Sequence, residues 1–371
     1  MSINVTIVST HLGHVRGGAE VNDLCLGSSL SELDHNVDYI TLNAPNKEFL
    51  PPDHPHRTIE CSYWYDCSYD LPNLLGKGIR HLNEELFVHR IKNKYSDVLI
   101  EKDLVLTTGR PILARLDSSI GGYLLYSAHG RVNPLYDRYL TRTDGLIFWG
   151  GCEREYENQA VLSRPHLTLD PAVDTDIFRP LAPPEQIELQ TGKRITIGFI
   201  GRLEPVKQVD RIIDAVASLI DTYSLHLVIV GDGSRRAELE SRAEHLLPSD
   251  TVDFVGRVGR EEVPEYLNSI DIFVMSSQLE NHPIALKEAV ACGTFCVAPN
   301  IGRVDEILDE DVGIAYSTDD SSALTKTLEN VLESETFCEG TREERSKQFN
   351  SWMDNVKKIV EFYKSLDTDG N

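Results

Sequence analysis

The chain has 371 residues, 41% of them apolar, so it is long enough for two globular domains that each bury a core. Its formal net charge is −23, and the basic residues comprise 23 arginines and only 13 lysines. Such acidity disfavours nucleic acid as a partner, because proteins that bind nucleic acid carry basic patches. A lysine-poor acidic surface is also typical of adaptation to high salt, so a halophile-like protein is a hypothesis.

Three features indicate the compartment. No apolar run reaches the roughly 18 residues of a membrane-spanning helix, and residues 1–10 lack the basic region and cleavage site of a signal peptide. Seven cysteines, an odd number without a C-x-x-C pair, argue against a disulfide framework and a structural zinc site. Cys292 and Cys296 are expected to pack as small apolar residues. We therefore expect a cytoplasmic protein.

The first 42 residues have the pattern of a strand, a glycine-rich turn, a helix and a second strand. Residues 3–9 are apolar and β-branched, as in a buried parallel strand. The turn contains Gly17 and Gly18, and a helical pattern at 21–33 and a strand at 37–42 follow. A glycine-rich turn here lets a ligand approach the backbone at the positive end of the helix dipole. Many such turns, however, need glycine only for their geometry.

Residues 43–100 are the least informative part of the chain. Four prolines within 45–55 mark irregular structure. Three aromatic residues, Tyr63, Trp64 and Tyr65, precede a helical pattern at 74–95. The aromatic cluster has two interpretations: ordinary loop packing, and contact with a sugar or a membrane interface. The sequence does not choose between them.

Further strands are predicted at 105–107, 123–127 and 143–148, and the second of them leads to His129. A histidine directly after a parallel strand lies where α/β folds bind ligands, although a single histidine is more often structural. Residues 163–193 then hold five prolines and few apolar runs, which is typical of a linker between domains.

A second series of strands and helices begins at residue 195. The strand at 195–200 leads to Gly-Arg-Leu-Glu-Pro-Val-Lys and a helix at 209–223, so Arg202 and Lys207 are predicted at the tip of a strand–helix loop. An arginine fork and a lysine point charge at such a tip suit a pyrophosphate, although charged loops are usually only solvated. The later strands at 227–230 and 252–255 end in Gly-Asp-Gly and Gly-Arg-Val, respectively.

The most informative stretch is 275–305. A short apolar strand leads into a polar turn that contains Glu280, and Pro283 starts a helix that carries Glu288. Gly293 ends this helix, and another strand follows at once. A turn and a helix can bring two carboxylates eight positions apart to one mouth, and the alternative is a solvated acidic face.

The order of these features resembles the donor-site signature of family-4 retaining glycosyltransferases with the GT-B fold. The shared features are a Ser-Ser pair, Glu280, Pro283, Glu-Ala from Glu288, Ala-Cys-Gly and a final Val-Ala. Counterparts of the family's G-G-A-E, A-D-x-V-I, V-D-x-x-x-F-x-P, G-R-L-x-x-x-K, G-x-G and F-S-W segments are also present. The resemblance covers roughly residues 3–42, 123–160 and 171–366.

The sequence departs from the family pattern at three places. Asn281 and His282 replace a glycine and a bulky residue, and Gln208 replaces the glycine that usually follows the lysine. Trp149 begins a Trp-Gly-Gly-Cys segment where serine is usual. The first departure predicts a sugar loop shaped for an unusual donor, the second constrains the phosphate turn, and the third makes the wall of the cleft atypical.

The resemblance implies an α/β protein of GT-B architecture, with two facing Rossmann-like domains built on parallel sheets. It implies an N-terminal acceptor-binding domain at 1–165, a linker at 166–193 and a nucleotide-sugar-binding domain at 194–345. A C-terminal crossover helix and tail at 346–371 would pass back to the first domain.

It also implies roles for individual residues. The catalytic group would be His129, Arg202, Lys207 and Glu280, with Glu280 beside the transferred sugar and Glu288 beside the nucleotide ribose. The donor-binding residues would be Gly17, Gly18, Gly231, Gly233, Arg257, Val258, Asn281, His282, Pro283, Ile284, Ala285 and Glu288.

The implied activity is retaining transfer of a sugar from a UDP- or GDP-linked donor to a hydroxyl of a saccharide. The acceptor saccharide would be free or linked to polyprenyl phosphate, and the reaction would belong to cell-surface glycan or glycoprotein biosynthesis. Peripheral contact of the protein with the cytoplasmic face of the membrane is one of two alternatives, the other being a protein that does not contact the membrane. No metal and no cofactor are expected, because the family does not require an Asp-x-Asp site. The alternatives are a nucleotide-sugar 2-epimerase, which lacks the Glu-Ala-x-Ala-Cys-Gly segment, and a non-catalytic nucleotide-sugar binding module.

Overall fold

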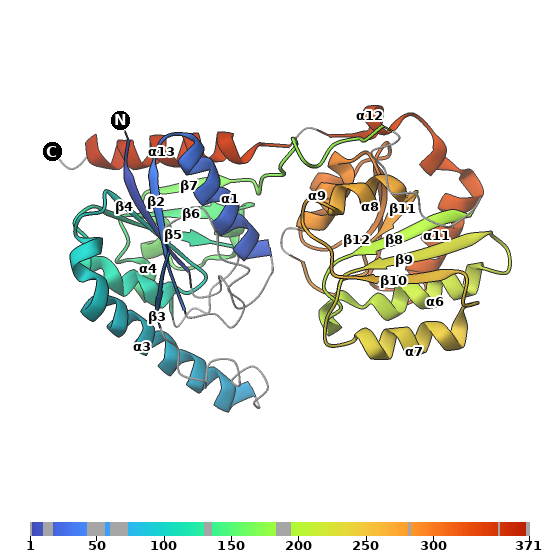
Figure 1. Ribbon diagram of the computed structural model, residues 1–371, viewed down its shortest axis with the longest axis horizontal. Helices are drawn as coiled ribbons and strands as arrows, with labels where there is room; N and C mark the ends of the chain where they lie inside the picture. The colour runs from blue at the N-terminus through green and yellow to red at the C-terminus, as the bar shows by residue number, and fades with distance from the viewer. Residues whose placement is uncertain are drawn as a thin grey trace. The chain divides into compact units, whose positions relative to one another are not determined.

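The computed structural model describes residues 2–9, 18–42, 56–59, 73–129, 136–182, 194–280, 283–347 and 349–368. The chain divides into two compact units. The first comprises Met1–Ala172 and Trp352–Asn371, and the second comprises Val173–Ser351. Each unit is built on a parallel sheet covered by helices (Figure 1).

The first sheet has the order β3-β2-β1-β4-β5-β6-β7 within the described residues, and all neighbouring strands are parallel. Its strands are β1 (Asn4–Ser9), β2 (Asn36–Leu42), β3 (His56–Ile59), β4 (Leu104–Thr108), β5 (Tyr123–Ala128), β6 (Gly145–Trp149) and β7 (His166–Leu169). The helices are α1 (Gly18–Glu32), α3 (Asn73–Leu99), η2 (Pro111–Ser119), α4 (Asp137–Leu140), η4 (Cys152–Glu155), α5 (Gln159–Leu162) and α13 (Trp352–Thr368).

Both faces of this sheet are covered, and consecutive residues of its central strands β1 and β4 are therefore buried instead of alternating in exposure. Ile7 on β1 belongs to one buried cluster with apolar side chains of α1 and α13, including Leu30 and Val356. Its neighbour Val8 belongs to another cluster with Phe87 of α3 and residues of η2. The closing helix α13 therefore completes the core of the first unit, although the second unit precedes it in the chain.

The second sheet has the order β10-β9-β8-β11-β12-β13, again all parallel. Its strands are β8 (Ile195–Ile200), β9 (Leu225–Val230), β10 (Val252–Gly256), β11 (Ile272–Val274), β12 (Phe295–Pro299) and β13 (Gly313–Tyr316). The helices are η5 (Pro205–Lys207), α6 (Val209–Leu219), α7 (Arg236–Leu246), α8 (Val263–Ser269), α9 (Ile284–Ala291), α10 (Val304–Ile307), α11 (Ala323–Ser334), η6 (Thr336–Cys338) and α12 (Arg342–Arg345). One core lies under α6, α7 and α11, and the other lies under α8, α9 and α10 (Figure 1).

The expected pair of Rossmann-like domains with parallel sheets is confirmed. The structure differs from the sequence interpretation in one stretch of the predicted linker 166–193. Residues His166–Leu169 form β7, which pairs with β6 and is the edge strand of the first sheet. The prolines around it concealed this strand, because a four-residue edge strand has too short an apolar pattern to stand out.

Gly293 ends α9 as expected, with a φ of +69°. A Cβ atom at this position would lie 2.0 Å from the backbone oxygen of Arg342, so close packing against α12 also requires glycine here. Pro283 differs slightly from expectation, since it is the N-cap of α9 and not its first helical residue.

In each sheet the strand order reverses beside the first strand of the unit, between β1 and β4 and between β8 and β11. Ligands of open α/β sheets bind at such a reversal, outside the carboxyl ends of the strands. In the second unit the loops in question follow β8 and β11. These loops carry Arg202, Lys207 and Glu280.

Candidate functional site

The loops that follow β8 and β11 are tied to each other by hydrogen bonds. The buried hydroxyl of Ser276 donates to the carbonyl oxygens of Lys207 at 2.8 Å and of Gln208 at 2.9 Å. The backbone N–H of Gln278 donates to the carbonyl of Val206, also at 2.8 Å. These bonds hold the two polar loops in a defined register at the point where the strand order reverses.

The same loops bring Lys207 and Glu280 into contact. The ammonium of Lys207 forms an ion pair with Oε1 of Glu280, and the hydroxyl of Ser277 donates to that oxygen at 2.8 Å. Both charged side chains are largely buried, with exposed fractions of 23% and 14%. Two of the residues that the sequence singled out, 73 positions apart, therefore form one polar centre.

Gln208 lies directly after this lysine and adopts a left-handed conformation, with φ +48° and ψ +44°. Only glycine adopts this conformation without a steric penalty. The departure from the family's glycine thus places strain in the turn that carries Lys207.

Gly231 and Gly233 have structural reasons for being glycine. Gly231 has a φ of +138°, and a Cβ there would lie 1.9 Å from the backbone oxygen of Gly201. At Gly233 a Cβ would lie 2.5 Å from the backbone oxygen of Leu203. The loops after β8 and β9 therefore pack backbone to backbone, and this packing requires both glycines whether or not a ligand approaches them.

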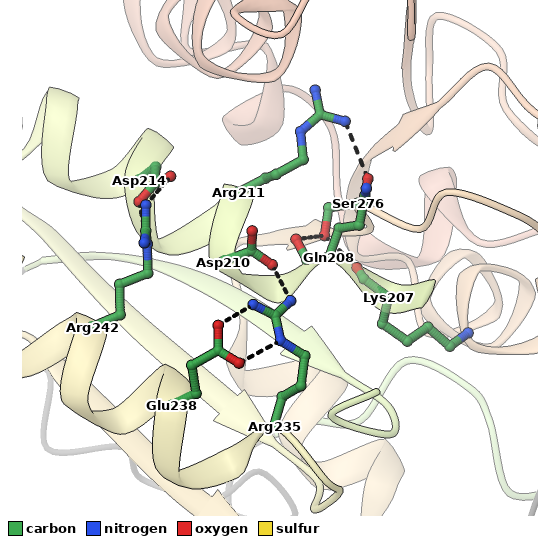
Figure 2. A network of polar contacts seen from close by, with 9 residues as sticks. All are labelled: Lys207, Gln208, Asp210, Arg211, Asp214, Arg235, Glu238, Arg242 and Ser276. Carbon is green, nitrogen blue, oxygen red and sulfur yellow. Dashed lines mark hydrogen bonds and ion pairs between the residues drawn. The ribbon is translucent and has the colours of Figure 1, made fainter. Parts of the chain in front are cut away.

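Several arginines near these loops are engaged by carboxylates (Figure 2). Arg235 pairs with Asp210 and Glu238, and Arg242 pairs with Asp214. The side chain of Lys207 extends away from this network. Arg202 is exposed and has no hydrogen bond or ion pair with any residue that the structure describes. The predicted phosphate-binding cations are thus distinct from the arginines that brace α6 and α7.

Glu288 is buried in α9, and Nη1 of Arg260 lies 2.9 Å from its Oε1. The guanidinium of Arg260 also lies over the ring of Phe178, 4.9 Å from the centroid. Burial raises the pKa of Glu288, and the charge of Arg260 opposes that rise. Glu280 and Glu288 therefore have different cationic partners.

Cys292, one helical turn after Glu288, is a buried thiol. Burial and the neighbouring Glu288 raise its pKa to about 12, so this cysteine is a packing residue and not a nucleophile. Cys296 is likewise fully buried. Both match the expectation that these cysteines pack as small apolar residues.

His129 follows β5 in the first unit, and both of its ring nitrogens have protein neighbours. Nδ1 lies 3.3 Å from the amide nitrogen of Asn22 on α1, and Nε2 lies 3.3 Å from the hydroxyl of Ser127. The ring stacks on Trp149 at a centroid distance of 5.7 Å, and the indole N–H donates to Ser127 at 2.7 Å. The imidazole is held in one orientation at the carboxyl end of the sheet.

The remaining predicted residues are distributed as follows. Gly18 is the first residue of α1, Arg257 is exposed after β10, and Val258 is half-buried beside it. Pro283 is buried, while Ile284 and Ala285 are half-buried at the start of α9. Gly17, Asn281, His282 and the aromatic cluster Tyr63, Trp64 and Tyr65 lie outside the described residues.

Sequence reasoning missed Arg260 and Asn22. Arg260 is the second arginine in the Gly-Arg-Val-Gly-Arg loop, and a repeated cation in a strand–helix loop was the available signal. Asn22 gave no signal, because a single polar residue in a helix is most often solvated. Among the described residues, no helix is long and apolar enough to cross a bilayer.

Residues 184–349 match the family model described as glycosyl transferases group 1. The chain is 29% identical over 194 residues to a phosphatidylinositol N-acetylglucosaminyltransferase subunit of Arabidopsis thaliana, covering 52% of this chain and 42% of the relative. It is 38% identical over 139 residues to a GDP-mannose-dependent alpha-mannosyltransferase of Mycobacterium tuberculosis, covering 37% and 34%. The chain thus spans about half or less of the curated relatives that it matches.

Among solved structures, the fold is similar to that of Anabaena HepE in complex with UDP. The TM-score is 0.75 at 17% identity, and the match covers 98% of this chain and 100% of that one. The chain therefore has the fold of the GT-B glycosyltransferases. Its residues 184–349 are similar to glycosyl transferases group 1, in agreement with the resemblance in its motifs.

Proposed function

We propose that the protein is a retaining glycosyltransferase that moves a sugar from a nucleoside-diphosphate sugar to a hydroxyl of a saccharide or lipid-linked saccharide. The observation that carries this proposal is the contact between Lys207 and Glu280 where the strand order of the second sheet reverses. A cation for phosphate and an acceptor for sugar hydroxyls lie side by side there. A nucleoside-diphosphate sugar presents those two chemistries on adjacent parts of one molecule.

In this proposal Arg202 and Lys207 bind the diphosphate and stabilise the charge that develops as it leaves. Glu280 accepts hydrogen bonds from the transferred sugar, and Glu288 accepts them from the ribose. Arg257 and Val258 present the backbone that meets the base.

The proposed chemistry is front-face substitution without an enzyme nucleophile. The acceptor oxygen forms its bond to the anomeric carbon on the face from which the bond to the β-phosphate oxygen breaks. The proton of the acceptor hydroxyl passes to the leaving phosphate, and the products are the glycoside and the nucleoside diphosphate. The residues of the chain bind and orient the reactants and stabilise charge. Neither a metal nor a cofactor has a step in this proposal.

The relatives support both nucleotides as candidates, since one depends on GDP-mannose and the HepE structure contains UDP. A thermal-shift screen of UDP, GDP and their sugars identifies the donor, because a bound ligand stabilises by RT ln(1 + [L]/Kd). Incubation with the labelled donor then tests the reaction. Transfer of label to an added saccharide supports the proposal. Conversion to a 2-epimeric sugar, or saturable binding without turnover, would replace it with the epimerase or the binding module.

The acceptor belongs to the same proposal. The Arabidopsis relative is named for phosphatidylinositol, and we infer a lipid-linked saccharide acceptor used at the cytoplasmic membrane face. Flotation with vesicles that contain polyprenyl-phosphate saccharide tests this part. Efficient transfer to soluble saccharides by a protein that never floats with the vesicles would remove it and leave glycosyl transfer in place.

A further inference from the structure

The ammonium that we assign to the diphosphate has an anionic partner within the protein itself. Lys207 is paired with Glu280, and the same carboxylate oxygen accepts the hydroxyl proton of Ser277 at 2.8 Å. The backbone of both loops is held in register by Ser276 and Gln278. The ion pair between Lys207 and Glu280 thus joins two loops that hydrogen bonds hold in place, unlike a chance pair between mobile surface side chains.

A carboxylate and a phosphate compete for the same group here. The lysine ammonium is a compact charge, and its attraction for an incoming anion is weakened while a carboxylate neutralises it. Both side chains are largely withdrawn from water, so solvent screens this competition only in part. Arg202, by contrast, is exposed and has no such partner among the described residues.

We propose that Glu280 is an internal competitor for the diphosphate, and that donor binding exchanges the partner of Lys207 from this carboxylate to phosphate. The inference rests on the proposed function and deepens it. The exchange frees the carboxylate of Glu280 to accept hydrogen bonds from the hydroxyls of the transferred sugar. An intact donor supplies those hydroxyls and compensates for the broken ion pair. A free nucleoside diphosphate does not supply them.

Glu280 is therefore a specificity-determining residue that favours the intact donor over the nucleoside diphosphate product. The expected change is opposite to that for an ordinary binding residue, because removing the charge of Glu280 strengthens the binding of the nucleoside diphosphate. A purely structural carboxylate predicts the opposite, since its loss loosens the loop and weakens every ligand.

The test uses Glu280→Gln in the full chain and measures the affinity for UDP and GDP by titration calorimetry. The glutamine keeps the size of the side chain and an oxygen for Ser277, but it no longer neutralises Lys207. We expect the nucleoside diphosphate that binds the native protein to bind about tenfold more tightly, which corresponds to about 1.4 kcal/mol. Turnover falls, and inhibition by the same nucleotide increases. Glu280→Ser, which also removes the carboxylate, is measured beside it to separate charge from side-chain shape.

The matched control is Glu204→Gln, which removes a carboxylate from the same β8 loop. The carboxylate of Glu204 accepts hydrogen bonds from the backbone N–H and the hydroxyl of Ser234, and it makes no ion pair with Lys207. We expect the nucleotide affinity of Glu204→Gln to stay within about twofold of the native value. The proposed gain in Glu280→Gln comes from freeing Lys207 and not from a general change in net charge. In Lys207→Ala/Glu280→Gln the gain disappears, since the group for which the two anions compete is gone.

Unchanged or weaker nucleotide binding by folded Glu280→Gln and Glu280→Ser overturns the exchange. So does an equal gain in Glu204→Gln. The proposed function has a separate readout, which is transfer of labelled sugar. If the native protein transfers no sugar and the Glu280 variants still bind nucleoside diphosphate more tightly, the exchange is supported and glycosyl transfer is rejected. Absence of binding of UDP, GDP and pyrophosphate to all variants rejects both.

Discussion

Arg260 is the residue whose removal tests the buried part of the site most directly. Replacing it with methionine removes the guanidinium 2.9 Å from Glu288 and leaves an apolar side chain against Phe178. The carboxylate would then remain buried without its cation. Breaking a buried ion pair on one side costs about 3 to 5 kcal/mol. Because a quarter of the Arg260 side chain is exposed, we expect about 3 kcal/mol, the lower end of this range.

Native-state hydrogen exchange measures this loss in the second unit alone. Strand β12 contributes side chains to both cores of the second unit, so the opening free energy of its amides reports the stability of this unit. A loss of about 3 kcal/mol lowers their protection roughly a hundredfold. The control is Arg236→Met, because Arg236 and its partner Glu240 are both about a third exposed. An exposed pair of this kind contributes little to stability, so Arg236→Met should keep most of the native protection.

The loss also depends on pH. Burial raises the pKa of Glu288 above its ordinary value of 4.5, and removing Arg260 removes the charge that opposes that rise. A carboxyl whose folded pKa is raised destabilises the folded state above that pKa, and the penalty disappears below the unfolded pKa. The difference between Arg260→Met and the native protein should therefore shrink as pH falls from 7 toward 4.5.

A second substitution separates the ion pair from simple packing. In Arg260→Met/Glu288→Gln the buried side chain at position 288 is neutral, so most of the lost stability should return. The pH dependence that the carboxyl of Glu288 contributed should then vanish. A single variant that loses less than about 1 kcal/mol would refute the assignment of Arg260 as the cation that stabilises the buried carboxyl of Glu288. A double variant that is no more stable than the single one would refute it too.

Three further outcomes are expected. Lys207→Ala should weaken the binding of both nucleoside diphosphate and intact donor by about tenfold or more in calorimetric titration, since one charge-assisted hydrogen bond contributes on the order of 1.5 to 3 kcal/mol. Equal affinity would remove Lys207 from the phosphate site. Gln208→Gly should raise the stability of the second unit by about 1 kcal/mol, because it relieves a left-handed residue, and an unchanged opening free energy in hydrogen exchange would contradict the strain. Gly231→Ala should destabilise by at least about 2 kcal/mol through its clash with Gly201, and calorimetry that shows a native melting temperature would refute this.

Much of the fold was determined by local sequence. The buried strands were predictable because runs of β-branched and apolar residues such as 195–200 have no other stable place than a sheet covered on both faces. The ends of these runs placed the polar loops, and with them Arg202, Lys207 and Glu280, at one edge of the sheet. The donor motifs were readable for the same reason, since each occupies a few consecutive residues.

The tertiary structure alone decided which of these groups meet. Lys207 and Glu280 are 73 positions apart, and their contact depends on β8 and β11 being neighbours across the reversal of strand order. His129 and Asn22 are 107 positions apart and meet because α1 packs on the strands that carry the histidine loop. The periodicity of apolar residues along the chain indicates which face of a helix or strand is buried, but it does not indicate which other element covers that face. Partner choice is therefore a property of the sheet order, and the ion pairs that define this site became visible only in three dimensions.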